Sequence, residues 1–366
     1  MIIGIDASRY NLESGTGVEL YSVKIINGII EYFKHHPDHT IVLYSPRKLT
    51  LYRTQKIQHR IIPFKRFWTK IRLSMEMLFH KPDVLFVPSH VLPHFCPKKS
   101  IITIHDTAFM HLKKEYSKRE YWYLKKTTKY AARKASSIIV PSEATKKDLM
   151  HFFNCSAEKI HVIPHGSDFK PKKFHADFDT KALEQLGLRR ADNFFLFIGR
   201  LESKKNLVRL IEAFAKFHET FKNFKLILAG RRGTGFSRIL KTVQKLKLTD
   251  CVFMPGYILE NEKHVLLKYC NAFVFPSLYE GFGFPILEAF SYQKPVITSP
   301  AASIPEVAED AAILVDPYDI NSIAEGMKKI VTDPKIKEKL LAKEEQQLKK
   351  FNWEVAVLKT IKVLVA

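Results

Sequence analysis

The sequence contains little cysteine, few acidic residues and no long hydrophobic run. Its four cysteines lie far apart and form no CxxC pair, so neither a disulfide framework nor a zinc site is indicated. No apolar stretch approaches the about 20 residues that a membrane-spanning helix needs. The segment Met1–Asp6 has the pattern of a buried strand with no signal peptide before it, so we expect a cytoplasmic protein.

The shortage of acidic residues leaves the chain strongly basic. It has 59 Lys and Arg against 37 Asp and Glu, a formal net charge of +22. The excess is concentrated in residues 46–81 and 113–134. Such a charge attracts anions, which include nucleic acid, an anionic membrane surface and phosphate-bearing small molecules. Aromatic residues accompany the basic ones at 64–68, but no common nucleic-acid recognition motif is present, so we expect no nucleic-acid partner.

The length of 366 residues suggests two domains. Short β-branched segments alternate with helical ones, and most are continuously apolar, as in parallel sheets covered by helices on both faces. A polar, proline-containing break near 168–192 separates two halves. The predicted strands are 2–7, 40–45, 83–88, 101–105, 137–141 and 160–164 in the first half, and 194–199, 225–229, 252–255, 272–276, 295–299 and 311–315 in the second.

These patterns predict an α/β protein with two doubly wound, Rossmann-like domains that face a central cleft. The first domain is placed at residues 1–175 and the second at 176–351. A last helix at 352–366, with Asn352 as its N-cap, is expected to rejoin the first domain. Ligands of such sheets bind beyond the carboxyl ends of the strands, so functional residues are expected there.

The most informative motif is Phe275–Phe290, in which a strand ends, a loop with two glycines follows, and a helix begins at Pro285. Backbone N–H groups at the start of that helix would face a phosphate at the positive end of its dipole. Glu280 before the loop and Glu288 inside the helix would accept hydrogen bonds from neighbouring hydroxyls of a sugar or ribose. A bare pair of glutamates at this spacing is more simply solvent-facing, but the glycines and the proline favour a binding site.

A second motif follows the strand predicted at 194–199. Gly199 and Arg200 lie at its carboxyl end, and Lys205 opens the next helix. The planar guanidinium of arginine and the compact ammonium of lysine can together hold a diphosphate. Lys204 and Lys205 alone would be ordinary solvated residues, but their position after a strand favours the diphosphate.

Two weaker signals lie in the first half. The segment Ser14–Glu19 contains Gly15 and Gly17 before a helix, where glycine allows a close approach to a ligand, although the third glycine of a dinucleotide-binding motif is missing. His105 follows a buried strand, which would direct it into the cleft. The simpler interpretations are a tight turn and a structural histidine.

Together these motifs resemble glycosyltransferase family 4, a large family of retaining enzymes with the GT-B fold. The resemblance covers nearly the whole chain, and its first-half pattern is most similar to a bacterial mannosyltransferase branch that often uses GDP-mannose. In the second half it rests on Phe197–Leu201, Lys205–Asn206, Leu228–Gly230, Val274–Ser277, Glu280–Glu288 and Ile304–Val307. In the first half it rests on Ile3–Ala7, Ser14–Gly17, Thr103–Asp106, Val140–Ser142 and Val162–Asp168.

The resemblance implies specific roles. Arg200 and Lys205 would bind the donor diphosphate and stabilise it as it leaves. Glu280 and His105 would contact the transferred sugar, and Glu288 would hold the ribose. The catalytic residues would be His105, Arg200, Lys205 and Glu280. The donor-binding residues would be Gly15, Gly17, Gly199, Arg200, Lys205, Tyr257 beside the base, Glu280, Phe282, Gly283, Phe284, Leu287 and Glu288.

The expected reaction moves a hexosyl group, most simply mannose from GDP-mannose, to a glycan or lipid-linked acceptor. Negative charge develops on the departing diphosphate, and Arg200, Lys205 and the loop amides can neutralise it without a metal or other cofactor. The nearest alternative is the same fold using UDP-glucose or another UDP-sugar. More distant alternatives are an inactive binding subunit and a nucleic-acid-binding protein.

The basic segment Lys65–Phe79 suggests a further partner. At helical spacing, four apolar residues share one face, namely Phe67, Ile71, Met75 and Leu78. Four basic residues flank that face, namely Lys65, Arg66, Lys70 and Arg72. This pattern suits docking on an anionic membrane surface, which would make the cytoplasmic enzyme peripheral at the inner face of the membrane. The alternative is that the apolar face packs on the first-domain sheet.

Overall fold

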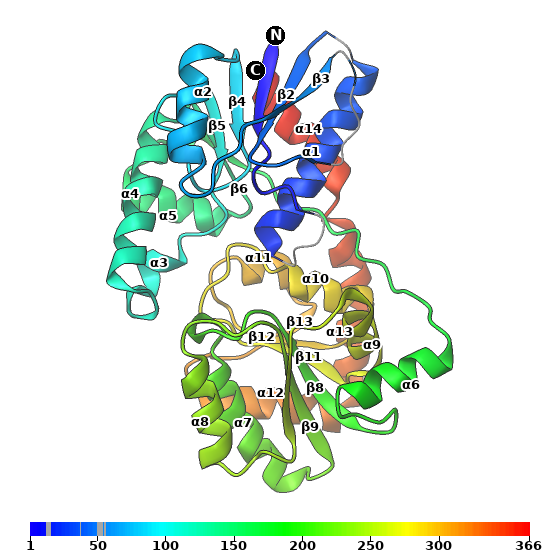
Figure 1. Cartoon of the computed structure of the whole chain (residues 1–366). Helices are drawn as coiled ribbons and strands as arrows, with labels where there is room; N and C mark the ends of the chain where they lie inside the picture. Colours follow the sequence, from blue (N-terminus) through cyan, green and yellow to red (C-terminus); the bar gives the residue numbers. More distant parts are fainter. Residues whose placement is uncertain (12–15, 37, 50–53, 55) are drawn as a thin grey trace. The chain divides into compact units, whose positions relative to one another are not determined.

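The computed structural model describes residues 1–11, 16–36, 38–49, 54 and 56–366. Contacts divide the chain into two compact units. Unit 1 comprises residues 1–111, 117–166 and 351–366, and unit 2 comprises residues 112–116 and 167–350 (Figure 1). The last helix therefore belongs to unit 1, and the boundary that we placed between residues 175 and 176 lies inside unit 2.

Unit 1 is built on a seven-stranded sheet with the order β3-β2-β1-β4-β5-β6-β7. Every pairing between its described strands is parallel. The direction of winding reverses between β1 and β4, which makes this the switch point of the sheet. The strands are β1 Ile2–Asp6, β2 Thr40–Ser45, β3 Ile57–Ile61, β4 Val84–Val87, β5 Lys99–Thr103, β6 Ser137–Val140 and β7 Ile160–Val162.

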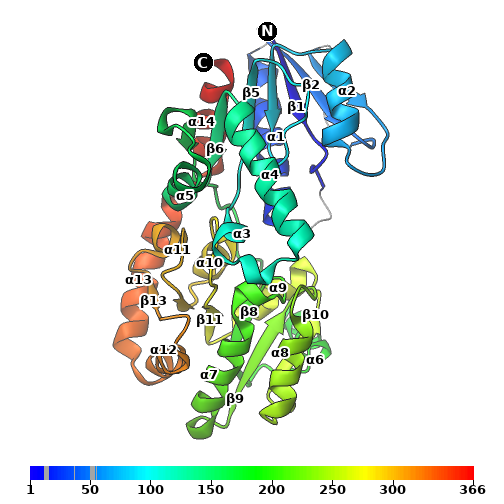
Figure 2. The ribbon, with the colours of Figure 1, turned by 90° about the vertical axis from the view of Figure 1, so that its left-hand side faces the viewer.

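Helices cover both faces of this sheet. Val84 and Phe86 of β4 belong to a core shared with α1 and α14, whereas Leu85 and Val87 belong to the core under α4 and α5 (Figure 2). This alternation of buried side chains is what a strand covered on both faces requires. The helices are α1 Gly17–His35, π-helix η1 Thr69–Leu73, α2 Ser74–Phe79, α3 Ala108–His111, α4 Lys118–Lys134, α5 Glu143–Phe153, η3 Ala157–Lys159 and α14 Trp353–Val365.

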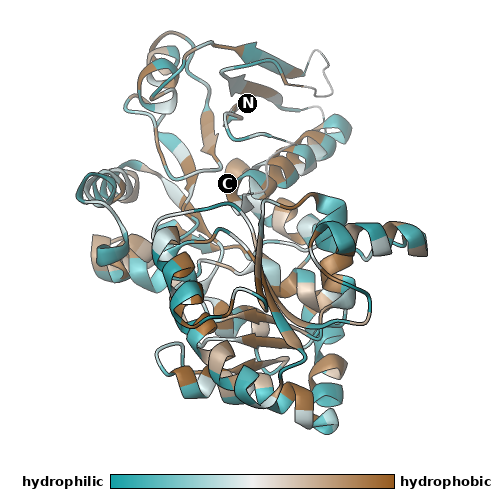
Figure 3. Ribbon diagram, turned by 60° about the horizontal axis from the view of Figure 1, so that its bottom comes forward, coloured by the Kyte–Doolittle hydropathy of each residue, from teal (hydrophilic) through white to brown (hydrophobic). Residues whose placement is uncertain are grey.

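Unit 2 is built on a six-stranded parallel sheet with the order β10-β9-β8-β11-β12-β13. Its winding reverses between β8 and β11, so β8, the first strand of the unit, lies in the middle of the sheet. The strands are coloured as strongly hydrophobic in Figure 3, in keeping with burial on both faces. They are β8 Asn193–Ile198, β9 Phe224–Ala229, β10 Val252–Gly256, β11 Ala272–Phe275, β12 Val296–Thr298 and β13 Ala312–Leu314.

The helices of unit 2 pack against one another in pairs, most of them between helices that are far apart in the sequence. Helix α7 packs against α8 and α12, α6 packs against α9, and α10 packs against α13. The helices are α6 Ala176–Gln185, α7 Leu207–Thr220, α8 Phe236–Lys245, α9 Glu260–Tyr269, α10 Phe284–Ser291, α11 Ile304–Ala308, α12 Ile320–Thr332 and α13 Pro334–Lys349. Two short helical turns complete the unit, η2 Lys113–Glu115 and η4 Ser203–Lys205.

The α/β class and the two doubly wound sheets are confirmed, and each of the twelve predicted strands is present with small shifts of its ends. Strand β3 was missed because Gln58, His59 and Arg60 give this edge strand a polar pattern. Asn352 caps the last helix as predicted, its Oδ1 accepting from the backbone N–H of Glu354 at 2.6 Å. Helix α10 begins one residue earlier than predicted, which puts Pro285 in its second position. Among the described residues, no helix is both long and apolar enough to cross a membrane.

Candidate active site

The two strongest motifs lie on either side of the switch point of unit 2. Gly199 and Arg200 directly follow β8, and the loop from Glu280 to Gly283 follows β11, which pairs with β8 in the sheet. Because both strands are parallel, their carboxyl ends lie at the same edge of the sheet (Figure 1). The fold therefore brings together, at the usual ligand position of such a sheet, two segments about 80 residues apart in sequence.

Backbone contacts fasten these two segments to each other. The N–H of Leu278 donates to the carbonyl oxygen of Lys204 at 2.9 Å. The buried Asn206 amide donates to the carbonyl oxygens of Pro276 at 3.2 Å and Pro317 at 2.6 Å. Asn206 has a φ of 61°, a left-handed conformation that asparagine tolerates better than most residues. Asn206 was not predicted as a site residue, although it fixes the backbone beside Lys205.

Lys205 and Glu280 are in direct contact. The Lys205 ammonium donates to Glu280 Oε1 at 2.5 Å, and the two side chains are only 12% and 11% exposed. The same ammonium lies 5.0 Å from the centroid of the Phe275 ring. Lys204 instead lies 3.8 Å from Glu202, and the Arg200 Nε lies 3.7 Å from that carboxylate. The structure thus separates the two adjacent lysines, because Lys205 alone of the two is paired with the predicted sugar-contacting glutamate.

A buried serine, Ser303, fixes the backbone of the loop that carries Glu280. Ser303 Oγ lies 2.9 Å from the carbonyl oxygens of both Glu280 and Phe282, and Ser303 has no exposed surface. At the end of this loop, Gly283 is the N-cap of α10 with a φ of 118°, a conformation that only glycine adopts without strain. The first turn of α10 therefore presents the positive end of its dipole beside Glu280. Ser303 was not predicted as a site residue.

Glu288 of α10 is paired with a lysine from the neighbouring helix. Lys263 Nζ of α9 donates to Glu288 Oε1 at 2.9 Å and lies 3.2 Å from Glu260. Burial raises the pKa of the Glu288 carboxyl above its usual range, and the charge of Lys263 opposes that rise. Burial disfavours the Lys263 ammonium, but the charges of Glu288 and Glu260 outweigh it and raise the pKa of Lys263. Nothing in the sequence links residue 263 to residue 288.

The ends of β8, β9 and β10 form the other side of the site. A Cβ atom at Gly230 would lie 1.8 Å from the carbonyl oxygen of Gly199, so the two strand ends can approach only because residue 230 is glycine. Tyr257, after β10, is 49% exposed. The Arg231 guanidinium lies 4.4 Å from the centroid of the Tyr257 ring. Arg231 was not predicted and adds a basic side chain beside the tyrosine expected to border the base.

The remaining predicted donor residues are placed less favourably. Leu287 has no exposed surface and Phe282 is 6% exposed. Both therefore pack behind the loop and do not line an open site, because a side chain facing inward stabilises the core and not a ligand. Phe284 contacts Phe282 edge to face, with ring centroids 5.1 Å apart. Gly17 is the first residue of α1, after the N-cap Thr16, whereas Gly15 lies outside the described residues.

His105 lies just after β5 in unit 1, among other rings. Its Nε2 lies 3.1 Å from the carbonyl oxygen of Pro88, which follows β4 at the switch point of that sheet. The rings of Tyr21, His90 and His165 lie 4.9, 5.2 and 5.5 Å from the His105 ring, measured between centroids. Burial lowers the pKa of His105 to about 3. His105 is therefore a neutral imidazole whose Nε2–H donates to Pro88, which leaves Nδ1 as an acceptor.

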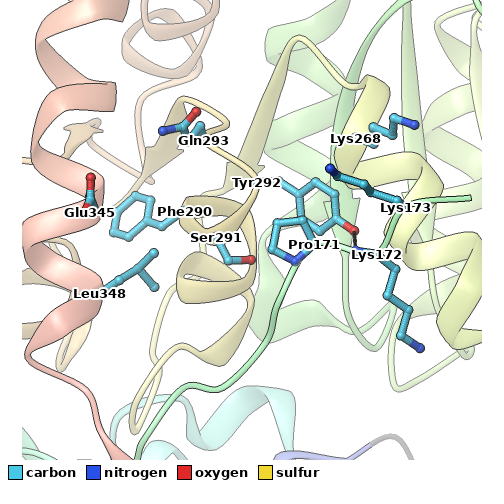
Figure 4. Close-up of a pocket in the computed structure, with 10 residues that line it drawn as sticks. All are labelled: Pro171, Lys172, Lys173, Lys268, Phe290, Ser291, Tyr292, Gln293, Glu345 and Leu348. Carbon is cyan, nitrogen blue, oxygen red and sulfur yellow. Dashed lines mark hydrogen bonds between the residues drawn. The ribbon is translucent and has the colours of Figure 1, made fainter.

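A pocket of about 450 Å³ lies at the opposite end of α10 from Gly283. Phe290 and Tyr292 reach it from the end of α10, Leu348 from α13, and Lys173 from the segment that enters unit 2 (Figure 4). None of the predicted site residues lines this pocket. In the described parts of the chain, no group of three or more His, Cys, Asp or Glu side chains has the arrangement of a metal site.

Comparison with known families agrees with this architecture. Residues 32–170 match the family described as Glycosyltransferase Family 4, and residues 178–347 match Glycosyl transferases group 1. Unit 1 and unit 2 thus each carry one of the two halves expected for such an enzyme. The chain belongs to the glycosyltransferases of family 4.

Several relatives are named as bacterial mannosyltransferases. The chain is 28% identical over 285 residues to O-antigen chain mannosyltransferase B of Escherichia coli, covering 77% of this chain and 74% of that protein. It is 24% identical over 335 residues to O-antigen chain mannosyltransferase RfbU of Salmonella typhimurium, covering 87% and 88%. The serotype-specific mannosyltransferase WbdA of E. coli is 26% identical over 292 residues, and the match spans only 35% of its length.

Solved structures show the same GT-B fold. Sucrose-phosphate synthase from Thermosynechococcus elongatus aligns with a TM-score of 0.76 and 18% identity, covering 99% of this chain and 98% of that one. Anabaena HepE, solved in complex with UDP and glucose, aligns with a TM-score of 0.72 and 20% identity, covering 100% and 99%. At this identity the comparison establishes the fold of the chain, two Rossmann-like sheets of the GT-B type.

Proposed function

We propose that this glycosyltransferase moves mannose from GDP-mannose to a glycan or lipid-linked acceptor, with retention of the anomeric configuration and without a metal ion. The donor part of the proposal draws on the mannosyltransferase relatives. The residues are those that the sequence singled out at the carboxyl edge of unit 2, together with His105 of unit 1. The observation that carries the proposal is the contact between Lys205 and Glu280 at the switch point of unit 2.

A buried lysine and glutamate in contact form a charge pair that a donor can rearrange. The attraction between the two opposite charges offsets part of the cost of removing both from water. When a nucleotide sugar binds, the Lys205 ammonium can turn to the diphosphate, and the Glu280 carboxylate can then accept hydrogen bonds from sugar hydroxyls. The first turn of α10 and the Arg200 guanidinium add further positive charge for the diphosphate.

The reaction breaks the bond between the anomeric carbon and the oxygen of the diphosphate. The electron pair leaves with the diphosphate, and Lys205 and Arg200 stabilise the charge that develops there. The acceptor hydroxyl attacks the anomeric carbon on the face from which the diphosphate leaves, and its proton passes to the departing phosphate oxygen. His105 contributes a neutral acceptor at Nδ1 for a sugar hydroxyl, because its Nε2–H is committed to Pro88.

A panel of nucleotide sugars tests the donor. At a ligand concentration of 100 times its Kd, binding stabilises the folded protein by roughly 2.7 kcal/mol, which a thermal-shift measurement detects. We expect GDP-mannose to stabilise the protein and Glu288→Gln to lose most of that effect. The exposed Glu325 serves as a matched control, since Glu325→Gln keeps the site intact. Stabilisation by UDP-glucose in place of GDP-mannose would identify a UDP-sugar enzyme, and no stabilisation by any nucleotide sugar would overturn the proposal.

Two further measurements address the product and the acceptor. The anomeric configuration of the product, read by proton NMR, decides between retention and inversion. A lipid-linked acceptor would bring this cytoplasmic enzyme to the inner face of the membrane as a peripheral protein. Transfer to an extracted lipid-linked glycan, compared with the same glycan free of lipid, tests that part. Binding of the donor without transfer to any acceptor would indicate a binding subunit.

A further inference from the structure

Residues 67–79 of unit 1 expose a continuous apolar stripe. Phe67, Ile71, Met75 and Leu78 follow one another at intervals of three or four residues, Phe79 comes directly after Leu78, and all five are between 44% and 76% exposed. The other side of the same segment carries Trp68, Leu73 and Met77, which are buried in the core of unit 1. The alternative that this stripe packs on the sheet is therefore wrong, because a different set of side chains makes that contact.

The segment is fixed in this orientation by polar anchors. Trp68 Nε1 donates to the carbonyl oxygen of Ile62 at 2.7 Å. The buried Glu76 carboxylate lies 2.9 Å from Arg60 and 3.3 Å from Arg72, so Arg72 turns inward and does not flank the stripe. Phe67 has a φ of 54°, a strained conformation for a bulky residue, and is 62% exposed. At Phe67 the folded chain therefore combines a strained backbone with an exposed apolar side chain.

Basic side chains surround the stripe. Lys65 and Arg66 precede it and are exposed. Lys70 lies 4.4 Å from the centroid of the Tyr123 ring, which joins the stripe to α4. Helix α4 carries the 54% exposed Trp122 and seven basic residues against one acidic residue. A groove of about 360 Å³ between the two elements is lined by Lys70, Leu92, His94, Lys126, Thr127 and Tyr130.

We propose that this docking face, formed by the stripe 67–79, the cations Lys65, Arg66 and Lys70, and the exposed side of α4, binds an anionic phospholipid bilayer. A bilayer offers acyl chains for the stripe and negatively charged phosphates for the cations at once. Nucleic acid would match the cations but leave the apolar stripe in water. A second copy of this chain would bring its own cations against these. The proposal does not depend on the donor or on the acceptor.

Vesicle co-sedimentation of the full chain tests the proposal. We expect binding to vesicles of equal parts phosphatidylcholine and phosphatidylglycerol, little binding to phosphatidylcholine alone, and a decline as added salt screens the charges. Replacing Phe67, Leu78 and Phe79 by Ser should lower the partition coefficient by roughly 1,000-fold, since each removed side chain gives up about tenfold. The matched control replaces Val355, Leu358 and Val365, exposed apolar residues of α14 in the same unit.

The charge requirement has its own pair of variants. Lys65→Gln with Arg66→Gln should weaken binding to the anionic vesicles, whereas Lys335→Gln with Lys339→Gln on α13 should not. Equal binding to neutral and anionic vesicles, or equal losses in stripe and control variants, would overturn the proposal. So would a stripe-dependent dimer in light scattering with no vesicle binding. Salt-sensitive binding to random oligonucleotides that the stripe variant leaves unchanged, without vesicle binding, would point to nucleic acid instead.

A separate observation concerns Lys263 of α9. It touches the Glu288 and Glu260 carboxylates, and its ammonium lies 4.4 Å from the centroid of the Phe169 ring. One contact comes from α9 itself, one from α10 and one from the segment that enters unit 2. Together they leave the ammonium little freedom to move. Lys263 therefore engages Oε1 of Glu288 and holds the carboxylate in one orientation. A ribose diol needs a carboxylate held in one orientation.

We infer that Lys263 is a positioning residue for the donor, acting through Glu288; this rests on the proposed function. Lys263→Met should weaken donor binding in titration calorimetry about tenfold or more and leave kcat at saturating donor nearly unchanged. Lys263→Arg should restore much of the affinity. In the Glu288→Gln background, Lys263→Met should have little further effect, because the carboxylate that it orients is gone. Independent losses in the double variant would overturn the inference, and absence of donor binding by the wild type would overturn the proposed function instead.

Discussion

The candidate site residues of the two units differ in charge. In unit 2 two predicted residues, Lys205 and Glu280, form an ion pair with each other, and the predicted Glu288 pairs with Lys263, which was not predicted; each of these side chains is no more than 16% exposed. In unit 1 the predicted residue His105 lies among Tyr21, His90 and His165 and is kept neutral by burial. Both sets lie beyond the carboxyl ends of parallel strands, so the fold alone does not explain the contrast.

The difference corresponds to the two chemical halves of a nucleotide sugar. A diphosphate carries charge, and its departure adds more, so it needs cations that are already in place. A hexose carries none, and neutral groups bind its hydroxyls without the desolvation cost of a buried ion. Under the proposed function, unit 2 therefore stabilises the leaving group and contacts the sugar through Glu280, and unit 1 adds a neutral contact to the sugar through His105. The following predictions test this division.

The largest effect is expected for the lysine at the switch point. Lys205→Ala should lower kcat by about 100-fold to 1,000-fold, the typical cost of removing one preorganised group that stabilises developing charge. Donor affinity should fall much less, because the diphosphate gains charge only in the transition state. Arg200→Ala should behave in the same way but more weakly, since its side chain is 65% exposed. Steady-state kinetics together with titration calorimetry measure the two quantities.

The adjacent lysine gives a matched control for that experiment. Lys204 is next in sequence and lies beside Glu202 instead of Glu280. Lys204→Ala should therefore change kcat only slightly. If Lys204→Ala and Lys205→Ala lowered kcat equally, the diphosphate would be held by both lysines, and the pairing with Glu280 would not mark the catalytic one. If Lys205→Ala reduced kcat and donor affinity by the same factor, Lys205 would serve only in binding.

The next effect concerns the ribose. Glu288→Ala should weaken donor binding by roughly 1.5–3 kcal/mol, the worth of hydrogen bonds to a charged group, while kcat at saturating donor changes little. Titration calorimetry with GDP-mannose measures the loss. Glu260 supplies the control, since it contacts the same lysine but has a side chain 57% exposed. Unchanged affinity in Glu288→Ala would refute the ribose assignment.

The sequence predicted which residues of unit 2 lie together at the carboxyl edge of the sheet, because these residues belong to short motifs. Gly199, Arg200, Lys205 and Glu280 follow strands that are strongly apolar, so their place at the sheet edge could be inferred from local pattern alone. The partners of these residues could not. Lys263 of α9 reaches Glu288 of α10 only in the folded unit, and Ser303 meets Glu280 only through the pairing of β11 with β12. Such contacts depend on tertiary structure, which no local pattern encodes.

Local pattern also failed where polarity and position conflicted. Strand β3 was missed because an edge strand needs little apolar surface, so its sequence reads as a loop. Leu287 was predicted as a donor-binding residue, and its side chain has no exposed surface, so a contact with the donor would have to come from its backbone. The stripe at 67–79 was recognised as one face of a helix, but the sequence left open which side of that helix is buried.

A smaller effect is expected in unit 1, on stability. The pKa of His105 is lowered from 6.5 to about 3, so the unfolded chain takes up a proton below pH 6.5 that the folded chain does not. The stabilising contribution of neutral His105 is therefore complete above pH 6.5 and is lost as the pH falls toward 3. The free energy of unfolding should fall by up to about 1.4 kcal/mol per pH unit from this group. Urea unfolding at several pH values measures the slope.

Variants separate His105 from the other buried histidines. His105→Gln should reduce the slope of the free energy of unfolding against pH by the contribution of one proton. His36→Gln, at an exposed position of unit 1, should leave that slope unchanged. His165 also has a lowered pKa because of burial, so some slope should remain in the His105 variant. An unchanged slope in His105→Gln would mean that the pKa of His105 is the same in the folded and the unfolded chain, so burial would not keep this histidine neutral as the pH falls.

The smallest effect expected is none at all, on removal of metal ions. If Lys205, Arg200 and the start of α10 supply the positive charge that the leaving diphosphate needs, exhaustive dialysis against a chelator should leave the transfer rate unchanged. The measurement is most sensitive in the Lys205→Ala variant, because this variant lacks one of the cations proposed to stabilise the diphosphate. Added magnesium or manganese should not restore that variant, because the diphosphate there is already bound by the remaining groups in a geometry set by the loop. Loss of wild-type activity on chelation, with recovery on adding either ion, would show that unit 2 supplies only part of the positive charge that stabilises the diphosphate. The contrast between an ionic unit 2 and a neutral unit 1 would then describe the structure of the protein but would not explain its mechanism.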